Sequence, residues 1–341
     1  MRRSRVRWEV LIGIFIFILV FISITPLTYS KPIVLKLGFV TAANKDDPYF
    51  IASKKFAQLI KKYTHGKYKV NLYPSGELGN EREMIKNLMI GTMDLGVITN
   101  APVGSFVHSF MILDMPFLFP NYKVAHEVLD GKAGEILLEK LSRINIKGLA
   151  FAEGGFREMI NNVRPIYSPE DLKGIKFRVM RTPIYIGLFR CLGANAVPLP
   201  WGSAFTAVQQ HVVDGLEIPV PVIWANKFYE VTKYLSLTNH TYSPLIIMAS
   251  GKLWNTLSKK DKIAFKKAAI EASHYERKKI ESIIGKLLIA LKNKGMKINT
   301  IKNPKPFMEA VKPLYKEFEP KIGAKIMKLV LEERDKLINS K

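Results

Sequence analysis

Hydrophobic and polar residues follow one another along the chain with two different periods, which predict strands and helices in alternation. Residues 33–40 are almost all apolar, as in a strand that is buried on both faces. Residues 81–90 instead carry apolar side chains at the spacing of one helical face. This order indicates a parallel sheet that is covered by helices. The first third of the chain is predicted to contain strands at 33–40, 68–72 and 94–98 and helices at 47–63 and 81–90.

A second unit with the same alternation begins near Glu153, and no proline-rich or low-complexity linker precedes it. Because ordinary strands join the two units, we expect two lobes with a cleft between them rather than two independent domains. The pattern predicts strands at 174–180, 196–199 and 214–217 and helices at 182–193 and 201–211.

One long helix is predicted in the last third, because residues 258–293 contain no proline and a single glycine, Gly285. Ser258 followed by Asp261 resembles an N-terminal cap. Such a helix is on the order of 50 Å long and would touch both lobes. The alternative is a pair of helices that break near Gly285. The predicted apolar stripe consists of Ile263, Ala264, Ala268, Ile270, Ile280, Ile283, Leu287 and Leu291.

The N-terminus has the features of an export signal. Four arginines lie among the first seven residues, and an apolar run at 10–24 is followed by Pro26 and a small-residue cleavage pattern ending at Ser30. We predict that residues 1–30 are a cleaved signal peptide and that the mature protein is exported. The alternative is a membrane anchor, although the apolar run is shorter than the roughly eighteen residues that a membrane-spanning helix needs. The single cysteine, Cys191, excludes an internal disulfide.

The chain is strongly basic, with 52 lysines and arginines against 29 acidic residues and a formal charge of +23. The lysines are scattered in pairs, such as Lys54 with Lys55 and Lys266 with Lys267, rather than gathered between exposed aromatic residues. This distribution favours a solvated lysine-rich surface and argues against nucleic acid as a partner. It also provides a modest field that attracts anionic solutes. A basic surface protein that binds anionic polymers is the structural alternative.

Motifs for catalysis are absent from the sequence. It has no nucleophile elbow, zinc-protease pair, phosphate-binding loop or dinucleotide fingerprint, and its six histidines are never closer than eighteen positions. Acidic pairs such as Asp46 with Asp47 lie at predicted helix starts, where carboxylates cap backbone amides. We therefore expect neither catalytic residues nor a metal or cofactor. A secreted α/β hydrolase or lyase that acts on organic acids is the enzyme alternative.

The placement of two arginines indicates anion binding rather than catalysis. Arg178 lies at the carboxyl end of the predicted strand 174–180, where ligands of open parallel sheets bind. Its guanidinium is a planar fork that matches a carboxylate, although the pattern alone favours a merely exposed strand arginine. Arg157 follows Gly154 and Gly155, which we expect to lie after the end of another strand. Trp201 begins a predicted helix and would serve equally as a pocket wall or as core.

Several collinear motifs in the mature chain are similar to those of one family. The sequence resembles the periplasmic solute receptors of tripartite ATP-independent periplasmic (TRAP) transporters, of the dicarboxylate-binding DctP type, from about Leu35 to the C-terminal helices. Motifs in a fixed order are more specific than any one alone. The matching stretches are YPSGELG (73–79), GTMDL (91–95), MPFLF (115–119), DLKGIKFRV (171–179), AVQQ (207–210), VDGLEIP (213–219), KFYEV (227–231) and TNH (238–240).

The resemblance implies a two-lobed periplasmic-binding-protein-like α/β fold with a hinge and a long helix that spans both lobes. It implies a periplasmic, monomeric receptor that binds a small organic carboxylate and delivers it to the small and large integral membrane subunits of a TRAP transporter. The segments that it implies are a signal peptide (1–30), lobe I (31–154 and about 244–283), lobe II (155–243 and about 284–311) and C-terminal helices packed on the lobes (312–341).

The resemblance also assigns the binding residues. The family's carboxylate-binding arginine falls on Arg178, an earlier arginine falls on Arg157, and an aromatic residue before the glutamine-rich helix falls on Trp201. The remaining expected site residues are Glu81, Glu217 and Thr99.

The chain departs from the sialic-acid branch of this family, in which polar side chains appear at the positions of Val40, Thr99 and Ile218. A polyhydroxylated sugar acid would lose several hydrogen bonds here, each worth about 0.5–1.5 kcal/mol. The departures therefore favour a smaller or more apolar organic acid, with Trp201 against its body. A second ligand carboxylate would need another cation, for which Arg157 is the leading candidate.

Overall fold

The computed structural model of the protein describes residues 31–339. From Val34 onward, the described residues form one compact unit. The predicted signal peptide at 1–30 lies outside the described residues, and its cleavage stays a prediction. Among the helices of the described part, none combines the length and the apolar character needed to cross a bilayer.

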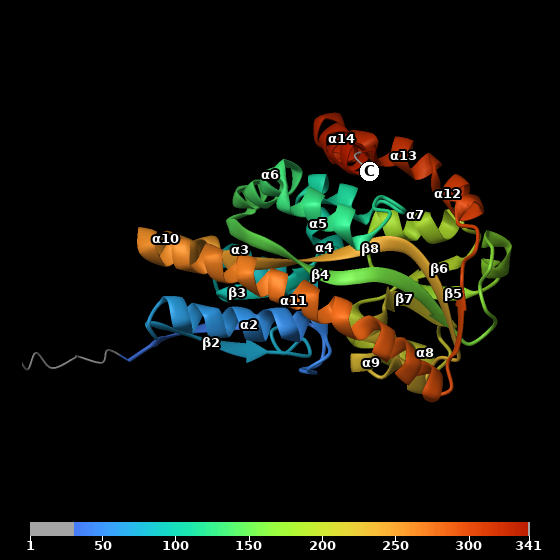
Figure 1. Ribbon diagram of the computed structural model, residues 1–341, viewed down its shortest axis with the longest axis horizontal. Coiled ribbons are helices and arrows are strands. Elements are labelled where there is room, and N and C mark those ends of the chain that lie inside the picture. The colour runs from blue at the N-terminus through green and yellow to red at the C-terminus, as the bar shows by residue number, and fades with distance from the viewer. Residues whose placement is uncertain (1–30, 340–341) are drawn as a thin grey trace, which may run out of the picture. The chain divides into compact units, whose positions relative to one another are not determined.

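A mixed sheet runs through this unit (Figure 1). Its strands within residues 31–339 are β1 (Ile33–Gly38), β2 (Tyr68–Tyr73), β3 (Leu95–Thr99), β4 (Ile146–Asn161), β5 (Lys176–Val179), β6 (Asn195–Pro198), β7 (Gly215–Pro219), β8 (Tyr234–Ser250) and β9 (Lys297–Thr300). Their spatial order is β2-β1-β3-β8-β4-β7-β5-β6, with β9 paired to β8. The pairs β1–β3, β5–β6 and β5–β7 are parallel, as the strand–helix alternation predicts.

The two longest strands, β4 and β8, pair antiparallel at the centre of the sheet, with β3 on one side and β7 on the other. β4 passes through Gly154 and Gly155 without ending, so the predicted strand end before Arg157 is wrong. The two glycines form an irregularity in the register with β8 instead of a turn. Gly155 has a φ of +105°, and a Cβ on Gly154 would lie 2.5 Å from the Ser243 carbonyl oxygen. Glycine is therefore required at both positions by the conformation and by the close approach of β8.

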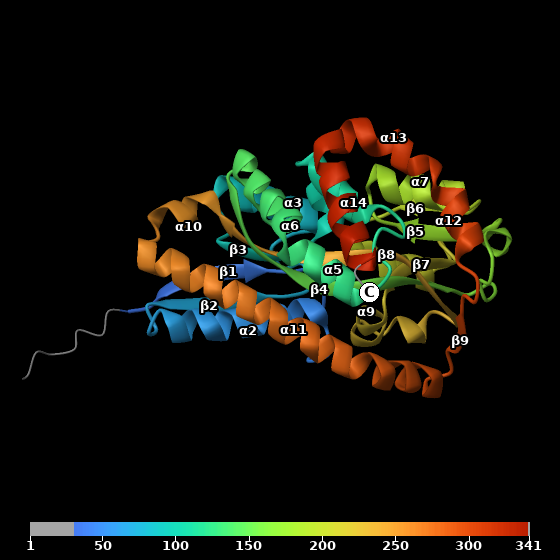
Figure 2. The ribbon, with the colours of Figure 1, turned by 45° about the horizontal axis from the view of Figure 1, so that its top comes forward.

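Helices cover both faces of the sheet (Figures 1 and 2). The α-helices are α2 (Pro48–Tyr63), α3 (Glu81–Ile90), α4 (Asn100–Gly104), α5 (Tyr122–Asp130), α6 (Lys132–Lys140), α7 (Pro183–Cys191), α8 (Ala204–Gln209), α9 (Val220–Ala225), α10 (Gly251–Thr256), α11 (Lys259–Asn293), α12 (Lys305–Val311), α13 (Pro313–Ile322) and α14 (Ala324–Asn339). The 3-10 helices are η1 (His108–Asp114), η2 (Leu141–Ile144), η3 (Pro169–Leu172), η4 (Trp201–Ser203) and η5 (Phe228–Glu230).

Local sequence signals explain where the helices near the site begin and end. Asp47 caps α2 by accepting a hydrogen bond from the Phe50 N–H, as expected for this acidic residue. Asn80 and Glu83 form a capping box at the start of α3. The predicted helix at 201–211 is shorter in the structure, because a 3-10 turn precedes α8 and His211 adopts a left-handed φ of 57°.

The long helix is continuous, so α11 excludes the alternative of a break near Gly285. One exposed glycine costs a helix only about 1 kcal/mol, which packing elsewhere along α11 outweighs. α11 packs against α2, β4 and α9 and so contacts elements at both ends of the sheet (Figure 1). Two residues of the predicted stripe, Ile263 and Ile270, are exposed. Five residues of the stripe are buried as predicted, namely Ala264, Ala268, Ile280, Leu287 and Leu291. The buried face also carries Phe265 and further alanines, because the helix lies close to β4 and α2.

The C-terminal helices also bridge elements that are far apart in the sequence (Figure 2). α14 packs on α5 and α6, whereas α12 and α13 pack on α7. The last third of the chain therefore contacts the rest of the molecule through two separate surfaces, one made by α11 and one by α12–α14.

Candidate ligand-binding site

Two adjoining cavities lie where elements of the first and second sequence units meet. The inner cavity, of about 30 Å³, has the polar lining residues Thr41, Tyr49, Glu81, Thr99, Arg157, Arg178 and Ser243. Its apolar lining residues are Val40, Met180, Trp201, Ile218, Pro219 and Val222. The outer cavity, of about 50 Å³, shares Glu81, Arg178, Met180 and Trp201 and adds Asn80, Arg82, Pro102, Arg181, Thr182, Leu199 and Pro200.

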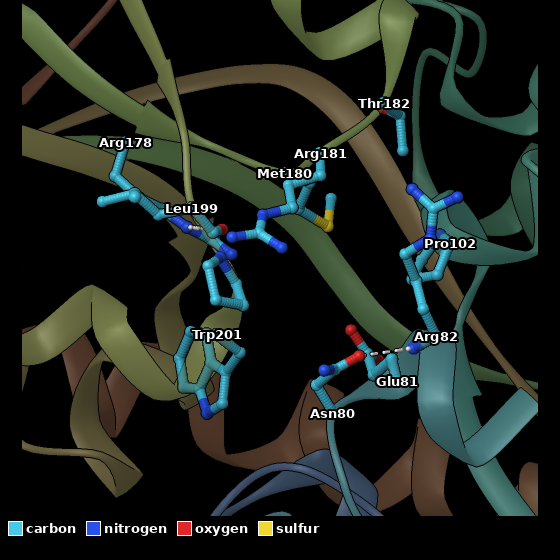
Figure 3. A pocket seen from close by; sticks show the side chains of 11 residues that line it. Asn80, Glu81, Arg82, Pro102, Arg178, Met180, Arg181, Thr182, Leu199 and Trp201 are labelled. Atoms are coloured by element: carbon cyan, nitrogen blue, oxygen red, sulfur yellow. Dashed lines mark hydrogen bonds between the residues drawn. The ribbon is translucent and has the colours of Figure 1, made fainter.

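Arg178 lies on β5 and lines both cavities (Figure 3). The residue is 3% exposed, and its Nε donates a hydrogen bond to the Leu199 carbonyl oxygen at 3.0 Å. Within residues 31–339, no carboxylate lies within 4 Å of its guanidinium. Burial lowers the pKa of Arg178 to about 10, so the group is charged at neutral pH. A buried cation without an internal counter-ion is suited to bind an anion from outside.

Arg157 lies on β4 and is equally buried, but its charge is compensated inside the fold. Its Nε and Nη2 donate to the Glu217 carboxylate, and Nη1 donates to Ser243 Oγ at 3.2 Å. Burial alone would lower the pKa of Arg157. The Glu217 carboxylate outweighs this effect of burial, so that the pKa of Arg157 is raised. Reciprocally, Arg157 outweighs the effect of burial and lowers the pKa of Glu217. His240 Nε2 lies 3.5 Å from the same carboxylate.

Glu81 lies in the first turn of α3, where its side chain faces the two cavities (Figure 3). Its Oε1 accepts a hydrogen bond from the Thr99 N–H at 3.0 Å, and burial raises the pKa of Glu81 to about 7. Thr99 Oγ1 lies 3.0 Å from Ser243 Oγ. Burial and the nearby Glu81 also raise the pKa of Tyr49, so its hydroxyl is neutral at physiological pH. These groups give the inner cavity one titratable carboxyl group and several hydroxyl groups.

Trp201 lies in η4, and its ring centroid is 5.5 Å from that of Phe228. It lines both cavities and faces them from below Arg178 in the view of Figure 3. With Ile218 and Val40 it gives the inner cavity an apolar wall. The indole is therefore placed to contact the hydrocarbon part of a bound molecule.

The structure brings most of the sequence-predicted site residues together. Arg178, Arg157, Trp201, Glu81 and Thr99 all line the inner cavity. Glu217 does not line either cavity but holds Arg157 in place.

The sequence analysis missed other lining residues, and those with polar side chains are Thr41, Tyr49, Asn80, Arg82, Arg181, Thr182 and Ser243. Arg181 follows the end of the same strand as Arg178, so the strand-end argument applies to it as well. No comparable signal marks Tyr49 or Ser243, because only the folded chain brings β8 and α2 to the cavity.

One set of polar contacts joins the first sequence unit directly to the second, which begins near Glu153. Asn226, which ends α9, accepts a hydrogen bond from the Ala42 N–H and donates to Asp47 Oδ2, each at 3.2 Å. Asn44 Nδ2 lies 3.5 Å from the Ala225 carbonyl oxygen. Asp47 also accepts from the Thr41 hydroxyl, and burial raises its pKa to about 7. Since Thr41 lines the inner cavity, these contacts hold the two walls of the site together.

Among residues 31–339, no group of three or more histidine, cysteine or acidic side chains is arranged to hold a metal ion. The ligand-binding chemistry of the described site therefore consists of guanidinium groups, hydroxyls, one carboxyl group and an apolar wall.

Comparison with solved structures places the fold. A solute-binding protein of a TRAP transporter from Polaromonas sp. JS666, bound to D-erythronate, superposes with a TM-score of 0.85 at 37% identity, over 88% of this chain and 98% of the other. The sugar-acid-binding protein DctPAm from Advenella mimigardefordensis, in complex with galactonate, superposes with a TM-score of 0.86 at 36% identity, over 90% and 99%. The expected two-lobed α/β fold with a long helix is thereby confirmed.

Sequence comparison gives the same result. The 2,3-diketo-L-gulonate-binding periplasmic protein YiaO of Escherichia coli is 34% identical over 302 residues, which are 87% of this chain and 91% of the relative. The model of the DctP family, bacterial extracellular solute-binding protein family 7, matches residues 39–321. The chain therefore belongs to the DctP family, whose members include the solute-binding proteins of TRAP transporters.

Proposed function

We propose that this protein is an extracytoplasmic receptor that captures a short organic carboxylate between its two lobes. The observation that carries the proposal is the Arg178 guanidinium, which is buried, charged and without an internal carboxylate partner at the wall of two cavities. A ligand carboxylate supplies the missing counter-ion through a bidentate contact in a site of low dielectric. The ligands of the related receptors, D-erythronate and galactonate, are carboxylates and support this reading.

The lining of the site supports a ligand with an apolar part. Thr41, Thr99 and Ser243 offer hydroxyls to the inner cavity, whereas Val40 and Ile218 offer none. Trp201 lines both cavities, and its indole suits the hydrocarbon part of a ligand. We infer a small or partly apolar organic acid with few hydroxyl groups, whose hydrocarbon part lies against Trp201.

The other site residues have supporting roles in this proposal. Glu217 fixes Arg157 and compensates its charge, which leaves the Arg157 guanidinium less free than that of Arg178 to bind a second carboxylate. Glu81 and Thr99 contribute polar groups opposite Arg178.

The proposed lobes are 31–154 with about 244–283, and 155–243 with about 284–311. Ligand binding to both lobes would favour the closed arrangement, because the closed form contacts the ligand from both sides. The proposal includes export to the periplasm by the signal at 1–30 and delivery of the ligand, by the monomer, to the small and large membrane subunits of a TRAP transporter.

Isothermal calorimetry with a panel of C4 to C6 organic acids tests the proposal. The Arg178→Met variant is expected to lose about 2–5 kcal/mol of binding free energy, because the ligand anion is left buried without its partner. Arg190→Gln is the matched control, since Arg190 pairs at 3.8 Å with Glu317 on the exposed side of α7. Unchanged affinity in Arg178→Met would contradict the proposal. Mass spectrometry of the recovered acid should find it intact, whereas a hydrolase or lyase would convert it.

A further inference from the structure

A buried contact between α11 and β4 lies outside the two cavities of the proposed ligand site. Glu276, in the middle of α11, is fully buried, and its Oε2 accepts a hydrogen bond at 2.9 Å from the N–H of Glu153 on β4. α11 runs across β4 in Figure 1 and packs against it. Neither residue lines either cavity, so the function proposed above gives this contact no role.

The contact lies where the chain passes between the proposed lobes. We call these three crossings the hinge, and they fall at 154/155 on β4, at 243/244 on β8 and at about 283/284 on α11. Glu153 directly precedes the first crossing, and it lies opposite Pro244, which directly follows the second. Glu276 lies about two helical turns before the third. The hydrogen bond therefore joins β4 to α11 beside the hinge.

The pairing of β4 with β8 is disrupted at this point. The register shifts between the pairs Glu153–Pro244 and Gly155–Ser243, so that Gly154 is an extra residue in β4. Pro244 also has no N–H to contribute to the pairing. Because a buried backbone N–H needs an acceptor, the Glu153 N–H depends on the one that α11 provides.

The side chain of Glu153 extends the contact to two further elements. Its Oε2 accepts a hydrogen bond from the Tyr242 hydroxyl on β8 at 3.3 Å and contacts His126 Nε2 on α5. Glu153 and Tyr242 are both buried. Glu153 is thus linked to β8, α5 and α11, and the bond to Glu276 is the part of this cluster that includes the long helix.

The surroundings of Glu276 favour a neutral carboxyl group. Among the described residues, no cationic side chain lies within 4 Å of this carboxyl group, since the neighbouring Arg277 pairs with Asp130 instead. Burial and the nearby Glu153 raise the pKa of Glu276 well above its usual range. A carboxylate here would be a second buried negative charge beside Glu153.

The two oxygens of Glu276 have different surroundings. Oε2 accepts from the Glu153 N–H, whereas Oε1 has no hydrogen-bond partner. No other acidic side chain between residues 31 and 339 has a buried oxygen without a partner. The proton therefore belongs on Oε1, which leaves Oε2 free to accept. Glutamine has the same shape, is neutral and keeps an accepting oxygen.

We propose that Glu276 is a positioning residue of the hinge: its neutral carboxyl group fixes α11 to the irregular segment of β4 about which the lobes close. Ligand capture then depends on a residue that never touches the ligand. Because the closed form contacts the ligand from both sides, a loosened hinge lowers the population that is competent to bind. The inference rests on the proposed function for the lobe motion, but not on the identity of the ligand.

Distances between two spin labels test the inference without a ligand. The labels replace Lys86 on α3 and Gln209 on α8, which are exposed residues of the two proposed lobes, in a Cys191→Ser background. Glu276→Met removes the acceptor and should broaden the distance distribution. Glu276→Gln keeps an acceptor without charge and should reproduce the wild type. Glu281→Met, at an exposed position of the same helix, is the matched control and should also reproduce it.

Two further measurements address binding and the protonation state. D-erythronate, to which the Polaromonas receptor is bound, serves as the calorimetric probe. Glu276→Met should weaken its binding about tenfold, because one buried hydrogen bond of the closed form is lost, whereas Glu276→Gln should change it less than about twofold. The infrared difference spectrum between the wild type and Glu276→Gln should contain the C=O band of one protonated carboxyl group.

The outcomes separate this inference from the function on which it rests. A folded Glu276→Met variant with the distance distribution of the wild type would overturn the positioning role. A Glu276→Gln variant that behaves like Glu276→Met would overturn it as well, and so would a difference spectrum without the protonated band. Thermal unfolding establishes which variants fold, and the spectrum and Glu276→Gln decide the inference if Glu276→Met does not. If D-erythronate does not bind the wild type, that result counts against the proposed function, and the ligand-free distances still decide the role of Glu276.

Discussion

Arg157 and Arg178 are two buried arginines of the same cavity whose surroundings differ in one respect. Arg157 is 4% exposed and Arg178 is 3% exposed, and both line the inner cavity. Arg157 has a carboxylate partner in Glu217, whereas Arg178 has none among the described residues. The pKa of Arg157 is accordingly raised, and that of Arg178 is lowered to about 10. Burial alone therefore does not distinguish the two arginines; the absence of an internal counter-ion does, and it is the basis on which we propose Arg178 as the ligand-binding arginine.

The register of the sheet causes the difference. Arg157 lies opposite Pro219 on β7 and opposite Thr241 on β8, which places it beside Glu217 and Ser243. Its partners belong to the neighbouring strands β7 and β8 of the same sheet. Arg178 lies near the end of β5, and the walls opposite it come from α2 and α3. Arg157 is thus a framework arginine, paired within the sheet, whereas Arg178 has no carboxylate partner among the described residues.

The largest effect that this comparison predicts is on stability, in Arg157→Met. Removing one partner of a buried ion pair costs about 3–5 kcal/mol of the free energy of unfolding, because Glu217 is left as an uncompensated buried charge. Arg178→Met should leave the free energy of unfolding unchanged or increase it, because it removes a buried charge without an internal partner. Urea denaturation measures both variants.

A double variant controls for lost packing around Arg157. Arg157→Met with Glu217→Leu removes both charges and is expected to recover most of the stability that Arg157→Met loses. The comparison would be wrong if Arg178→Met were as destabilising as Arg157→Met.

The sequence was sufficient to predict the local helices and strands of the fold and to favour anion binding over catalysis. Apolar periodicity located β1, β3 and β5, and the absence of proline located α11. The length of β4 and β8 was not evident, because the pairing of two distant strands is not encoded in the period of either one. Gly154 and Gly155 also have the composition of a turn, and only the approach of Ser243 makes them a bulge inside β4.

The site was predictable only in part. The position of Arg178 at a strand end is a local property, but on the pattern alone it favoured an exposed arginine, and the family resemblance was needed to place Arg178 among the expected site residues. The pairing of Arg157 with Glu217 joins residues that are 60 positions apart and follows only from the register of β4 with β7. Arg82 on α3 and Arg181 after β5 both line the outer cavity, which depends on how these two elements meet. Tertiary contacts thus decide which of two similar arginines is free.

A second prediction concerns Glu81, whose carboxyl group lines both cavities together with Arg178. Its pKa is raised to about 7, and a bound anion raises it further, so binding takes up protons. Affinity for a monocarboxylate should therefore fall as the pH rises from about 6 to about 8, by up to about tenfold for one unit of pKa change. Calorimetry across this range measures the slope.

Glu81→Gln separates this carboxyl group from Asp47, whose pKa is also raised to about 7. The variant should bind with an affinity that is nearly independent of pH over this range. If affinity instead rose with pH in the wild type, ionised Glu81 would favour ligand binding rather than oppose it. The uncompensated charge of Arg178 would then need another explanation.

The smallest predicted effect is on ligand affinity, in a variant of Asn226. It tests whether Arg178 and Arg157 depend to different degrees on the contact that Asn226 makes between the proposed lobes. Asn226 joins α9 to Ala42 and Asp47 and so helps to hold the walls of the inner cavity together. Asn226→Ala should weaken ligand binding by about 1 kcal/mol, or roughly fivefold, because neutral hydrogen bonds that form on closure are lost. The Arg157 pair lies within adjacent strands and does not need this contact, so the free energy of unfolding should change little.

Asn303→Ala is the matched control for calorimetry and urea denaturation, because it alters an exposed asparagine that accepts a hydrogen bond from the nearby Lys305 N–H. A loss of stability in Asn226→Ala as large as the loss of binding free energy would show that both centres depend on closure, and the distinction between a framework arginine and a ligand-binding arginine would fail.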